Sequence, residues 1–190
     1  YENTADGIRG AIERFPLELT ENGIALTLDE GADVHISPDL GDGIRAGRIP
    51  TLAGSRYLLL EPPHHVAPPR FEDVVFELMA QGIVPVTTHR ERLTWVEDHY
   101  DVFERLARRG AWMQVTAGAI TGRFGRRVKY WGERFLGEGI THLLATDAHH
   151  PKHLRNMPYG VLTARRGWLT APDVMNTLPL TEFAGALSQR

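Results

Sequence analysis

The chain has 190 residues, a formal net charge of −3 and no cysteine. This length fits one domain, the charge provides no basic surface for nucleic acid, and the lack of cysteine excludes disulfides, zinc–thiolate sites and a thiolate nucleophile while fitting a reducing compartment. No apolar run reaches the roughly 18 residues of a membrane helix and no signal-peptide pattern opens the chain, so we expect a soluble, cytoplasmic protein without membrane insertion.

The first part of the chain predicts one helix and two short strands. Residues 3–22 repeat apolar side chains at helical spacing, but Pro16 predicts a broken or late-starting helix. Residues 24–28 and 32–36 have strand patterns, and the turn-rich stretch 37–43 allows about one helical turn.

From residue 56 onward, strands and helices alternate. Apolar runs predict strands over 56–61, 83–87, 111–115 and 140–145, and helical spacing predicts helices over 71–79, 95–109, 125–136, 171–175 and 182–187. Several of these helices end at a glycine, which is typical of helix C-termini. A proline-rich loop over 62–69 contains two histidines.

This alternation predicts an α/β fold with a largely parallel sheet in a single domain over residues 1–190. About six strands are too few for a closed eight-stranded barrel. We therefore expect an irregular barrel, or a barrel that lacks its first strands.

Polar side chains follow the predicted strands where each one ends. In parallel α/β folds the residues after each strand face one common rim, so these side chains are expected to converge. They are Asp33 or His35, Glu61, His89, Arg92, Asp147 and His149.

Carboxylates and imidazoles together suit Mn, Fe, Zn or a similar divalent ion with exchangeable water. The pair Asp147 and His149 is compact, because side chains two residues apart in extended backbone point the same way. Arg92 offers a forked guanidinium for a phosphate beside the metal, and Arg155 could supply a second phosphate contact.

Other interpretations of these residues stay open at this point. The segment 89–92 could be a helix N-terminus with Glu91 paired to an arginine. Arg155 could be a solvated loop charge. Four further histidines fit exposed loops, although the first two could roof the site: His64, His65, His150 and His153.

Several segments, in this order, make the chain resemble the PHP-type metal-dependent tyrosine phosphatases of bacterial capsule and exopolysaccharide operons. They cover about residues 20–160 and are more specific together than any single motif. The matching segments are Gly-Ala-Asp-Val-His at 31–35, Ile-Pro-Thr-Leu at 49–52, the strand ending at Glu61, Gly82 to Arg92, Gln-Val-Thr-Ala-Gly at 114–118, Gly-Arg-Phe-Gly at 122–125 and Leu144 to His149.

The resemblance implies a distorted (β/α)7 PHP barrel that carries a cluster of divalent ions, with manganese the expected metal. It implies that Asp33, His89, Asp147 and His149 are metal ligands and that Arg92 and Arg155 bind phosphate. By the same resemblance, His149 or a neighbouring histidine protonates the leaving group.

The chain departs from this family in two places. The family begins with a His-x-His strand that has no counterpart here, so either an N-terminal segment is missing or part of the metal cluster has been lost; we expect truncation or disorder. Asp33 stands where the family has a bridging glutamate, so its carboxylate lies about one methylene further back.

The resemblance implies a phosphotyrosine-protein phosphatase acting on a tyrosine autokinase, and without cysteine such activity would have to depend on metal. Two alternatives remain: a PHP phosphoesterase that acts on a small-molecule phosphate monoester, and a non-catalytic regulatory domain. The native metal, the substrate and the oligomeric state are left open by the sequence.

Overall fold

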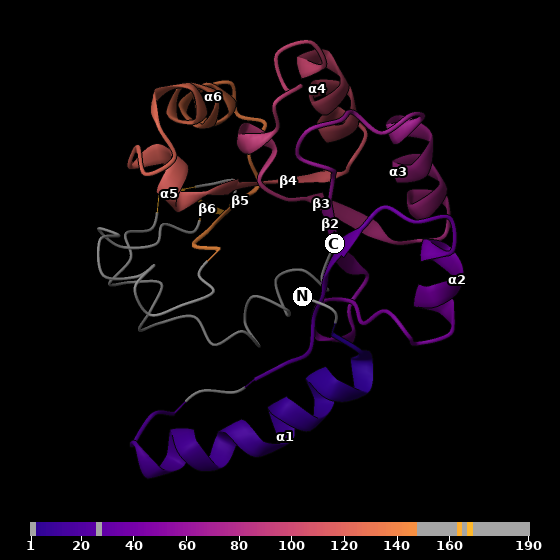
Figure 1. Ribbon diagram of the computed structural model, residues 1–190, viewed down its shortest axis with the longest axis vertical. Helices are drawn as coiled ribbons and strands as arrows, with labels where there is room; N and C mark the ends of the chain where they lie inside the picture. Colours follow the sequence, from indigo (N-terminus) through magenta and orange to yellow (C-terminus); the bar gives the residue numbers. More distant parts are fainter. Residues whose placement is uncertain (1–2, 26–27, 148–162, 165–166, 169–190) are drawn as a thin grey trace.

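The computed structural model describes residues 3–25, 28–147, 163–164 and 167–168 (Figure 1). Within these residues, five strands form one parallel sheet whose order follows the sequence. The strands are β1 (Asp33–His35), β2 (Tyr57–Glu61), β3 (Val84–Thr87), β4 (Trp112–Thr116) and β5 (Leu143–Ala145). The predicted α/β class and parallel sheet are therefore confirmed.

Helices connect successive strands and follow one another around one side of the curved sheet (Figure 1). Because the strand order contains no reversal, the sheet has the sequential arrangement found in barrels rather than that of doubly wound folds. The helices are α1 (Ala5–Glu21), α2 (Leu40–Arg45), α3 (Phe71–Ala80), α4 (Tyr100–Arg108), α5 (Ala117–Ile120) and α6 (Arg126–Gly137), with 3-10 turns η1 (Leu52–Gly54) and η2 (Arg90–Arg92).

The strand register places the C-terminal ends of neighbouring strands at the same edge of the sheet. His35 is level with Glu61, and Leu60 is level with Thr87. At the other end of the strand order, where β4 pairs with β5, Thr116 is level with Ala145. Residues that follow these strands are therefore close in space although they are far apart in sequence.

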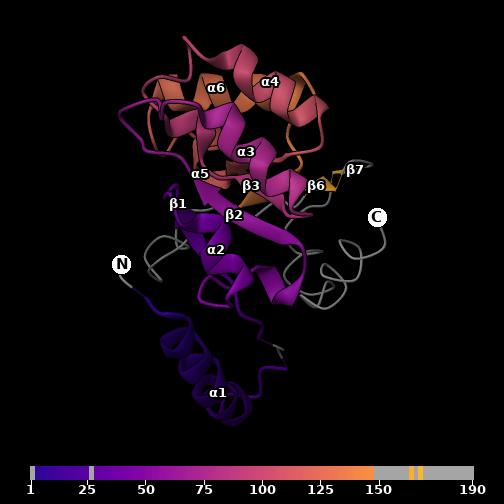
Figure 2. The ribbon, with the colours of Figure 1, turned by 90° about the vertical axis from the view of Figure 1, so that its right-hand side faces the viewer.

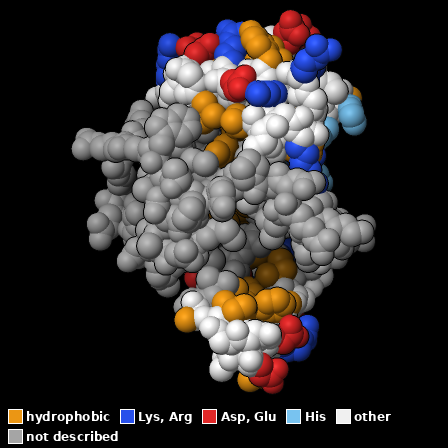
Figure 3. All heavy atoms as spheres, turned by 90° about the vertical axis from the view of Figure 1, so that its left-hand side faces the viewer, with side chains coloured by type: hydrophobic (Ala, Val, Ile, Leu, Met, Phe, Trp, Pro, Cys, Tyr) orange, Lys and Arg blue, Asp and Glu red, His pale blue; other side chains and the backbone are white. Residues whose placement is uncertain are grey.

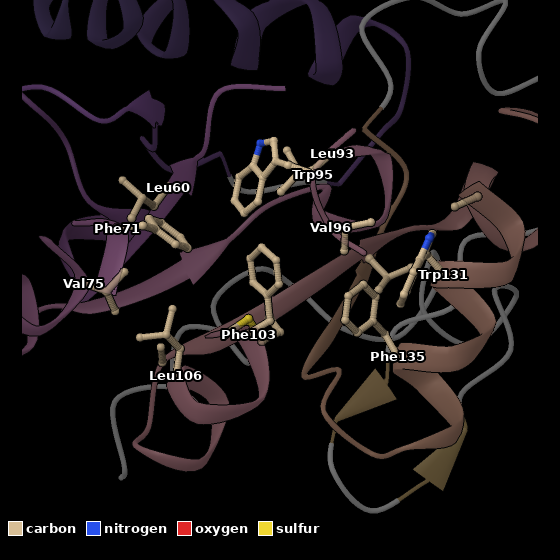
Figure 4. Close-up of a cluster of buried hydrophobic side chains, with 14 of the residues drawn as sticks. Leu60, Phe71, Val75, Leu93, Trp95, Val96, Phe103, Leu106, Trp131 and Phe135 are labelled. Carbon is tan, nitrogen blue, oxygen red and sulfur yellow. The ribbon is translucent and has the colours of Figure 1, made fainter. Parts of the chain in front are cut away.

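The main core lies between the sheet and the helices α3, α4 and α6 (Figure 4). Aromatic rings join these layers: Phe103 stacks on Trp95 with centroids 5.5 Å apart and meets Phe135 edge-on at 6.2 Å. Phe103 and Phe135 are fully buried. This packing makes the sheet a rigid support for the loops at its edge.

The break predicted at Pro16 is wrong, because α1 continues through this residue. Proline removes one backbone donor, but the helix is otherwise well capped: the Thr4 hydroxyl accepts from the Gly7 amide at 3.1 Å. At the other end, the side-chain amide of Asn22 donates to the Glu18 carbonyl at 2.7 Å. The helix therefore tolerates the loss of one bond on an exposed surface.

Two further predictions differ from the structure. The described residues of the stretch 24–28 form no strand, and residues 26–27 lie outside the described part. Helix α4 begins at Tyr100 rather than near Trp95, because the Trp95 indole donates to the Pro63 carbonyl at 2.8 Å and holds this segment in turns. The helices predicted over 171–175 and 182–187 also lie outside the described residues.

Four small elements were not predicted. They are the 3-10 turn η1, the helix α5 and the antiparallel pair β6 (Thr163–Ala164) and β7 (Gly167–Trp168). In the described part of the chain, no helix is both long and apolar enough to cross a bilayer.

Helix α1 lies apart from the layer of helices that covers the sheet (Figures 1 and 2). Figure 3 shows hydrophobic side chains gathered at this lower end of the molecule. The exposed apolar residues of this region are Phe15, Leu17 and Ile24.

Candidate metal and phosphate site

The ends of strands β1, β2 and β3 bring an imidazole and two carboxylates together. The Nε2 atom of His89 lies 3.3 Å from an Asp33 carboxylate oxygen and 3.6 Å from a Glu61 oxygen. The other Asp33 oxygen accepts from the Thr88 hydroxyl at 3.2 Å, which orients this carboxylate toward His89. The convergence predicted from the strand ends is therefore observed for these three residues.

The proline-rich loop after β2 adds a fourth group, His64. Its Nε2 atom lies 3.3 Å from Glu61, and its ring centroid lies 6.0 Å from that of His89. The loop is fixed against the segment after η2, because the Thr94 amide donates to the His64 carbonyl at 2.9 Å. His64 therefore belongs to the site, whereas His65 is exposed.

Asp147 completes the group and lies in the segment that follows β5, the last strand in the order of the sheet. Its carboxylate lies 3.8 Å from the Nδ1 atom of His89 and accepts a hydrogen bond from Arg92 at 2.7 Å. The Arg92 guanidinium also lies 4.8 Å from the centroid of the Phe124 ring. Arg92 is thus held at the edge of the site by a carboxylate and an aromatic ring.

Two residues of this group have left-handed backbone. The φ angle is 41° at His89 and 51° at Asp147, a region that residues other than glycine rarely adopt. The backbone amide of His89 is fixed in place because it donates a hydrogen bond of 2.9 Å to the side-chain oxygen of the buried Gln114. Such local strain concentrates at functional sites, where the surrounding structure compensates for it.

The two residues after His89 point into the core instead of the site. Arg90 is fully buried, with its guanidinium 4.1 Å from the centroid of Phe135 and a hydrogen bond to the Thr141 hydroxyl at 2.9 Å. The Glu91 carboxylate accepts from the Thr116 amide at 2.9 Å. Burial lowers the pKa of Arg90 to about 9 and raises the pKa of Glu91.

The alternative interpretation of this segment is thus only partly right. It does form a short 3-10 turn, η2. However, Glu91 forms no ion pair with an arginine among the described residues. Instead, Glu91 ties the turn that carries His89 and Arg92 to the end of strand β4.

The two imidazoles differ in their electrostatic surroundings. Burial, followed by the positive charge of Arg92, lowers the pKa of His64 and favours its neutral form. Burial also opposes a charge on His89, but the hydrogen bond to Asp33 and the negative charge of Asp147 outweigh it and raise the pKa of His89. A proton therefore competes with a metal ion for His89 more strongly than it does at an ordinary histidine.

The donor set of this site fits a divalent cation. Ligand atoms of Glu61, His64 and His89 lie within 4.8 Å of one another. The buried Nδ1 atom of His89 has no hydrogen-bond partner in the described structure. Carboxylate and imidazole donors without thiolate are typical of catalytic sites for Mn, Fe or Zn.

The sequence-predicted site residues divide into three groups. Asp33, His89, Arg92 and Asp147 are brought together, as the preceding distances show. His149 and Arg155, with His150 and His153, lie outside the described residues. His35 lies at the rim, with its side chain 76% exposed and 3.6 Å from Glu61.

For His64 the sequence favours an exposed loop that could also roof the site, and the structure agrees with the second interpretation, because His64 lies 3.3 Å from Glu61. The available signal was its position three residues after Glu61, at the end of a predicted strand. The sequence predicts that Glu61 converges on the site but does not identify it as a metal ligand.

These features define a parallel α/β protein with a carboxylate–imidazole cation site and an arginine at the C-terminal edge of its sheet. The family described as "Capsular polysaccharide synthesis, CpsB/CapC" matches residues 1–159. The chain therefore belongs to this family.

Two curated relatives illustrate the similarity. The chain is 26% identical over 152 residues to tyrosine-protein phosphatase YwqE of Bacillus subtilis (strain 168), covering 80% of this chain and 60% of the relative. It is 28% identical over 159 residues to the putative tyrosine-protein phosphatase CapC of Staphylococcus aureus, covering 84% and 61%. The chain thus spans about 60% of the length of these relatives.

A solved structure supports the fold. It is described among crystal structures of YwqE from Bacillus subtilis and CpsB from Streptococcus pneumoniae as unique metal-dependent tyrosine phosphatases. The TM-score is 0.79 at 24% identity, and the match covers 100% of this chain and 75% of the other. At this identity the similarity establishes the fold.

Proposed function

We propose that this protein is a metal-dependent phosphotyrosine-protein phosphatase that acts on a tyrosine autokinase in capsule or exopolysaccharide synthesis. The observation that carries the proposal is the convergence of Asp33, Glu61, His89 and Asp147 beside Arg92. Membership of the CpsB/CapC family and relatives named tyrosine-protein phosphatases support it. We further propose that the parallel sheet is part of a distorted (β/α)7 PHP barrel.

In this proposal Asp33, His89 and Asp147 hold divalent ions, with Glu61 and His64 as additional ligands. His149 is the remaining proposed ligand and lies outside the described residues. Manganese is the proposed metal. When bound, such ions lower the pKa of a coordinated water and neutralise charge on phosphate.

Arg92 binds the phosphate of the substrate. Its guanidinium uses Nη1 to bind Asp147, and its other nitrogens donate to no described residue. They are therefore available for two phosphate oxygens in the forked geometry that arginine favours. Arg92 stabilises the negative charge that increases on these oxygens in the transition state, and Arg155 is the proposed second contact.

Proton transfer to the leaving group is assigned to His149 or a neighbouring histidine. A phenolate leaving group has an unperturbed pKa of about 10, so it needs less assistance than an alkoxide. A phosphocysteine intermediate is impossible, because the chain contains no cysteine.

The test is hydrolysis of a phosphotyrosine peptide by protein that has been treated with EDTA and then restored with Mn. We expect activity to disappear with EDTA and to return with Mn. A phosphoserine peptide and a sugar phosphate are assayed in parallel. Activity that survives EDTA would refute metal dependence, and metal-dependent activity restricted to the sugar phosphate would replace the protein substrate with a small molecule.

A further inference from the structure

A groove lies between α6 and the beginning of α4, and none of the proposed metal ligands that the structure describes lines it. It has a volume of about 660 Å³. Helices α4 and α6 lie side by side in both ribbon views (Figures 1 and 2). The lining residues are Glu97, Tyr100, Arg126, Arg127, Tyr130, Trp131 and Arg134.

Aromatic rings and a guanidinium form the wall of this groove. Arg134 lies 4.2 Å from the Tyr100 ring centroid and 5.2 Å from that of Trp131. The Tyr130 ring meets Trp131 edge-on with centroids 5.3 Å apart, and Tyr130 is 56% exposed. Trp131 and Tyr100 pack on the core through Phe135, so this wall is preformed.

The groove carries an excess of positive charge. Three arginines and one glutamate line it. Glu138 pairs with Arg134, whereas Arg126 is exposed and forms no ion pair with a described residue. Arg127 donates to the carbonyls of Leu93 and Thr94 at 3.1 and 3.0 Å. In the described part of the chain it forms no ion pair with a carboxylate.

The groove lies next to the proposed phosphate site, because Arg127 of the groove is hydrogen-bonded to the residue that follows Arg92. Leu93, whose carbonyl accepts from Arg127, directly follows Arg92. On the other side, Phe124 contacts the Arg92 guanidinium and is separated from Arg126 only by Gly125. A chain bound with its phosphate at Arg92 therefore has to extend only a few residues, at about 3.3 Å each, to reach the groove.

We propose that this groove binds an acidic segment with an aromatic side chain that flanks the phosphotyrosine of the substrate protein. Carboxylates of the segment pair with Arg126 and Arg127, and its aromatic side chain packs against Tyr130 and Trp131. This inference rests on the proposed function and adds a substrate preference to it. Figure 3 shows basic, acidic and hydrophobic side chains intermixed at this upper end of the molecule.

The test compares two phosphotyrosine peptides that differ only in glutamate against glutamine at the flanking positions. For the metal-loaded protein we expect kcat/KM to be about tenfold higher for the glutamate peptide, mainly through KM, because each charged contact contributes at that scale. Arg126→Gln should remove most of this preference. The matched control is Arg48→Gln, another exposed arginine without an ion pair to a described residue, which should keep the preference.

Two further measurements separate this inference from the proposed function. Hydrolysis of p-nitrophenyl phosphate should be unchanged in Arg126→Gln, because that substrate does not reach the groove. Fluorescence anisotropy with the unphosphorylated glutamate peptide measures groove binding without catalysis. If the protein hydrolyses no phosphotyrosine but binds this peptide through Arg126, the proposed function fails while the groove assignment stands.

Equal kcat/KM for the two peptides, or equal peptide affinity of the parent protein and Arg126→Gln, would overturn the inference. A change in oligomeric state caused by Arg126→Gln without a change in peptide affinity would also overturn it, since the groove would then be an interface between copies of this chain.

Discussion

At the scale of single residues, His89 is the centre of the candidate site. Its two ring nitrogens face carboxylates from different strands, Asp33 and Glu61 on one side and Asp147 on the other. Its left-handed backbone is fixed by Gln114. No other described side chain contacts so many of the proposed ligands, so its removal tests the site most directly.

We expect His89→Ala to lower the affinity for Mn by more than roughly tenfold, since even changes outside the ligand shell have that effect. Phosphatase activity should fall in parallel. The measurement is the Mn content per chain after dialysis, together with circular dichroism to verify folding. The matched control is His99→Ala, because His99 contacts the Trp95 carbonyl and lies outside the site; equal Mn loss in both variants would contradict the assignment.

Arg92 provides a second test at this scale. Arg92→Lys keeps the positive charge but loses the planar fork, so kcat/KM for a phosphotyrosine peptide should fall about 10- to 100-fold. The matched control is Arg123→Lys, since Arg123 lies over the same Phe124 ring at 5.5 Å. A similar loss in both variants would mean that stacking on Phe124, rather than phosphate binding, explains the effect.

At the scale of elements, α3 and α4 are joined by a forked ion pair. The Arg105 guanidinium donates two hydrogen bonds of 2.9 Å each to the Glu72 carboxylate. The hydrogen bond to Arg105 lowers the pKa of Glu72. This pair connects two of the helices that cover the sheet, so it contributes to the support beneath the site.

A lowered carboxylate pKa gives stability above the unfolded pKa of 4.5, and this stability is lost as pH falls through the folded value. We expect Glu72→Gln to lower Tm by about 1–3 °C at pH 7, because the pair is partly exposed to solvent. The difference from the parent protein should vanish well below pH 4.5. Thermal unfolding across pH is the measurement; Glu77→Gln on the same helix is the control and should show little change.

The sequence predicted most of the sheet but not every helix boundary. Strands β2 and β3 and helix α3 form where their apolar patterns predict them, because the apolar residues of each pattern are the ones that the core buries. Helix α4 starts late because Trp95 is held by Pro63, a contact that no local pattern encodes. Likewise, α1 passes through Pro16 because its caps and exposed surface compensate for one lost bond.

At the scale of the whole molecule, the described ligands lie in strands β1 and β2 or in the segments that follow β2, β3 and β5. The described ligands range from Asp33 to Asp147 in the sequence, and contacts to His89 at 3.3 to 3.8 Å bring Asp33, Glu61 and Asp147 together. A cation bound there would add a further connection to the hydrogen bonds that already join these segments, such as the one from Arg92 to Asp147. Metal binding should therefore stabilise the folded state as a whole.

We expect Mn to raise Tm. At a free Mn concentration of about 100 times Kd the gain corresponds to roughly 2.7 kcal/mol. Differential scanning calorimetry with and without Mn is the measurement, and EDTA should reverse the shift. His89→Ala should show little or no shift; an equal shift in that variant would place the metal elsewhere.

The sequence by itself determined the parallel α/β class, the strands of the five-stranded sheet and the polar residues near their ends, because apolar patterns and strand ends are local properties of the chain. The tertiary structure decided which of these residues meet. It added His64 through the position of its loop, and it directed Arg90 and Glu91 into the core while Arg92 turned to Asp147. These outcomes depend on backbone angles and contacts between distant segments, which sequence spacing does not specify.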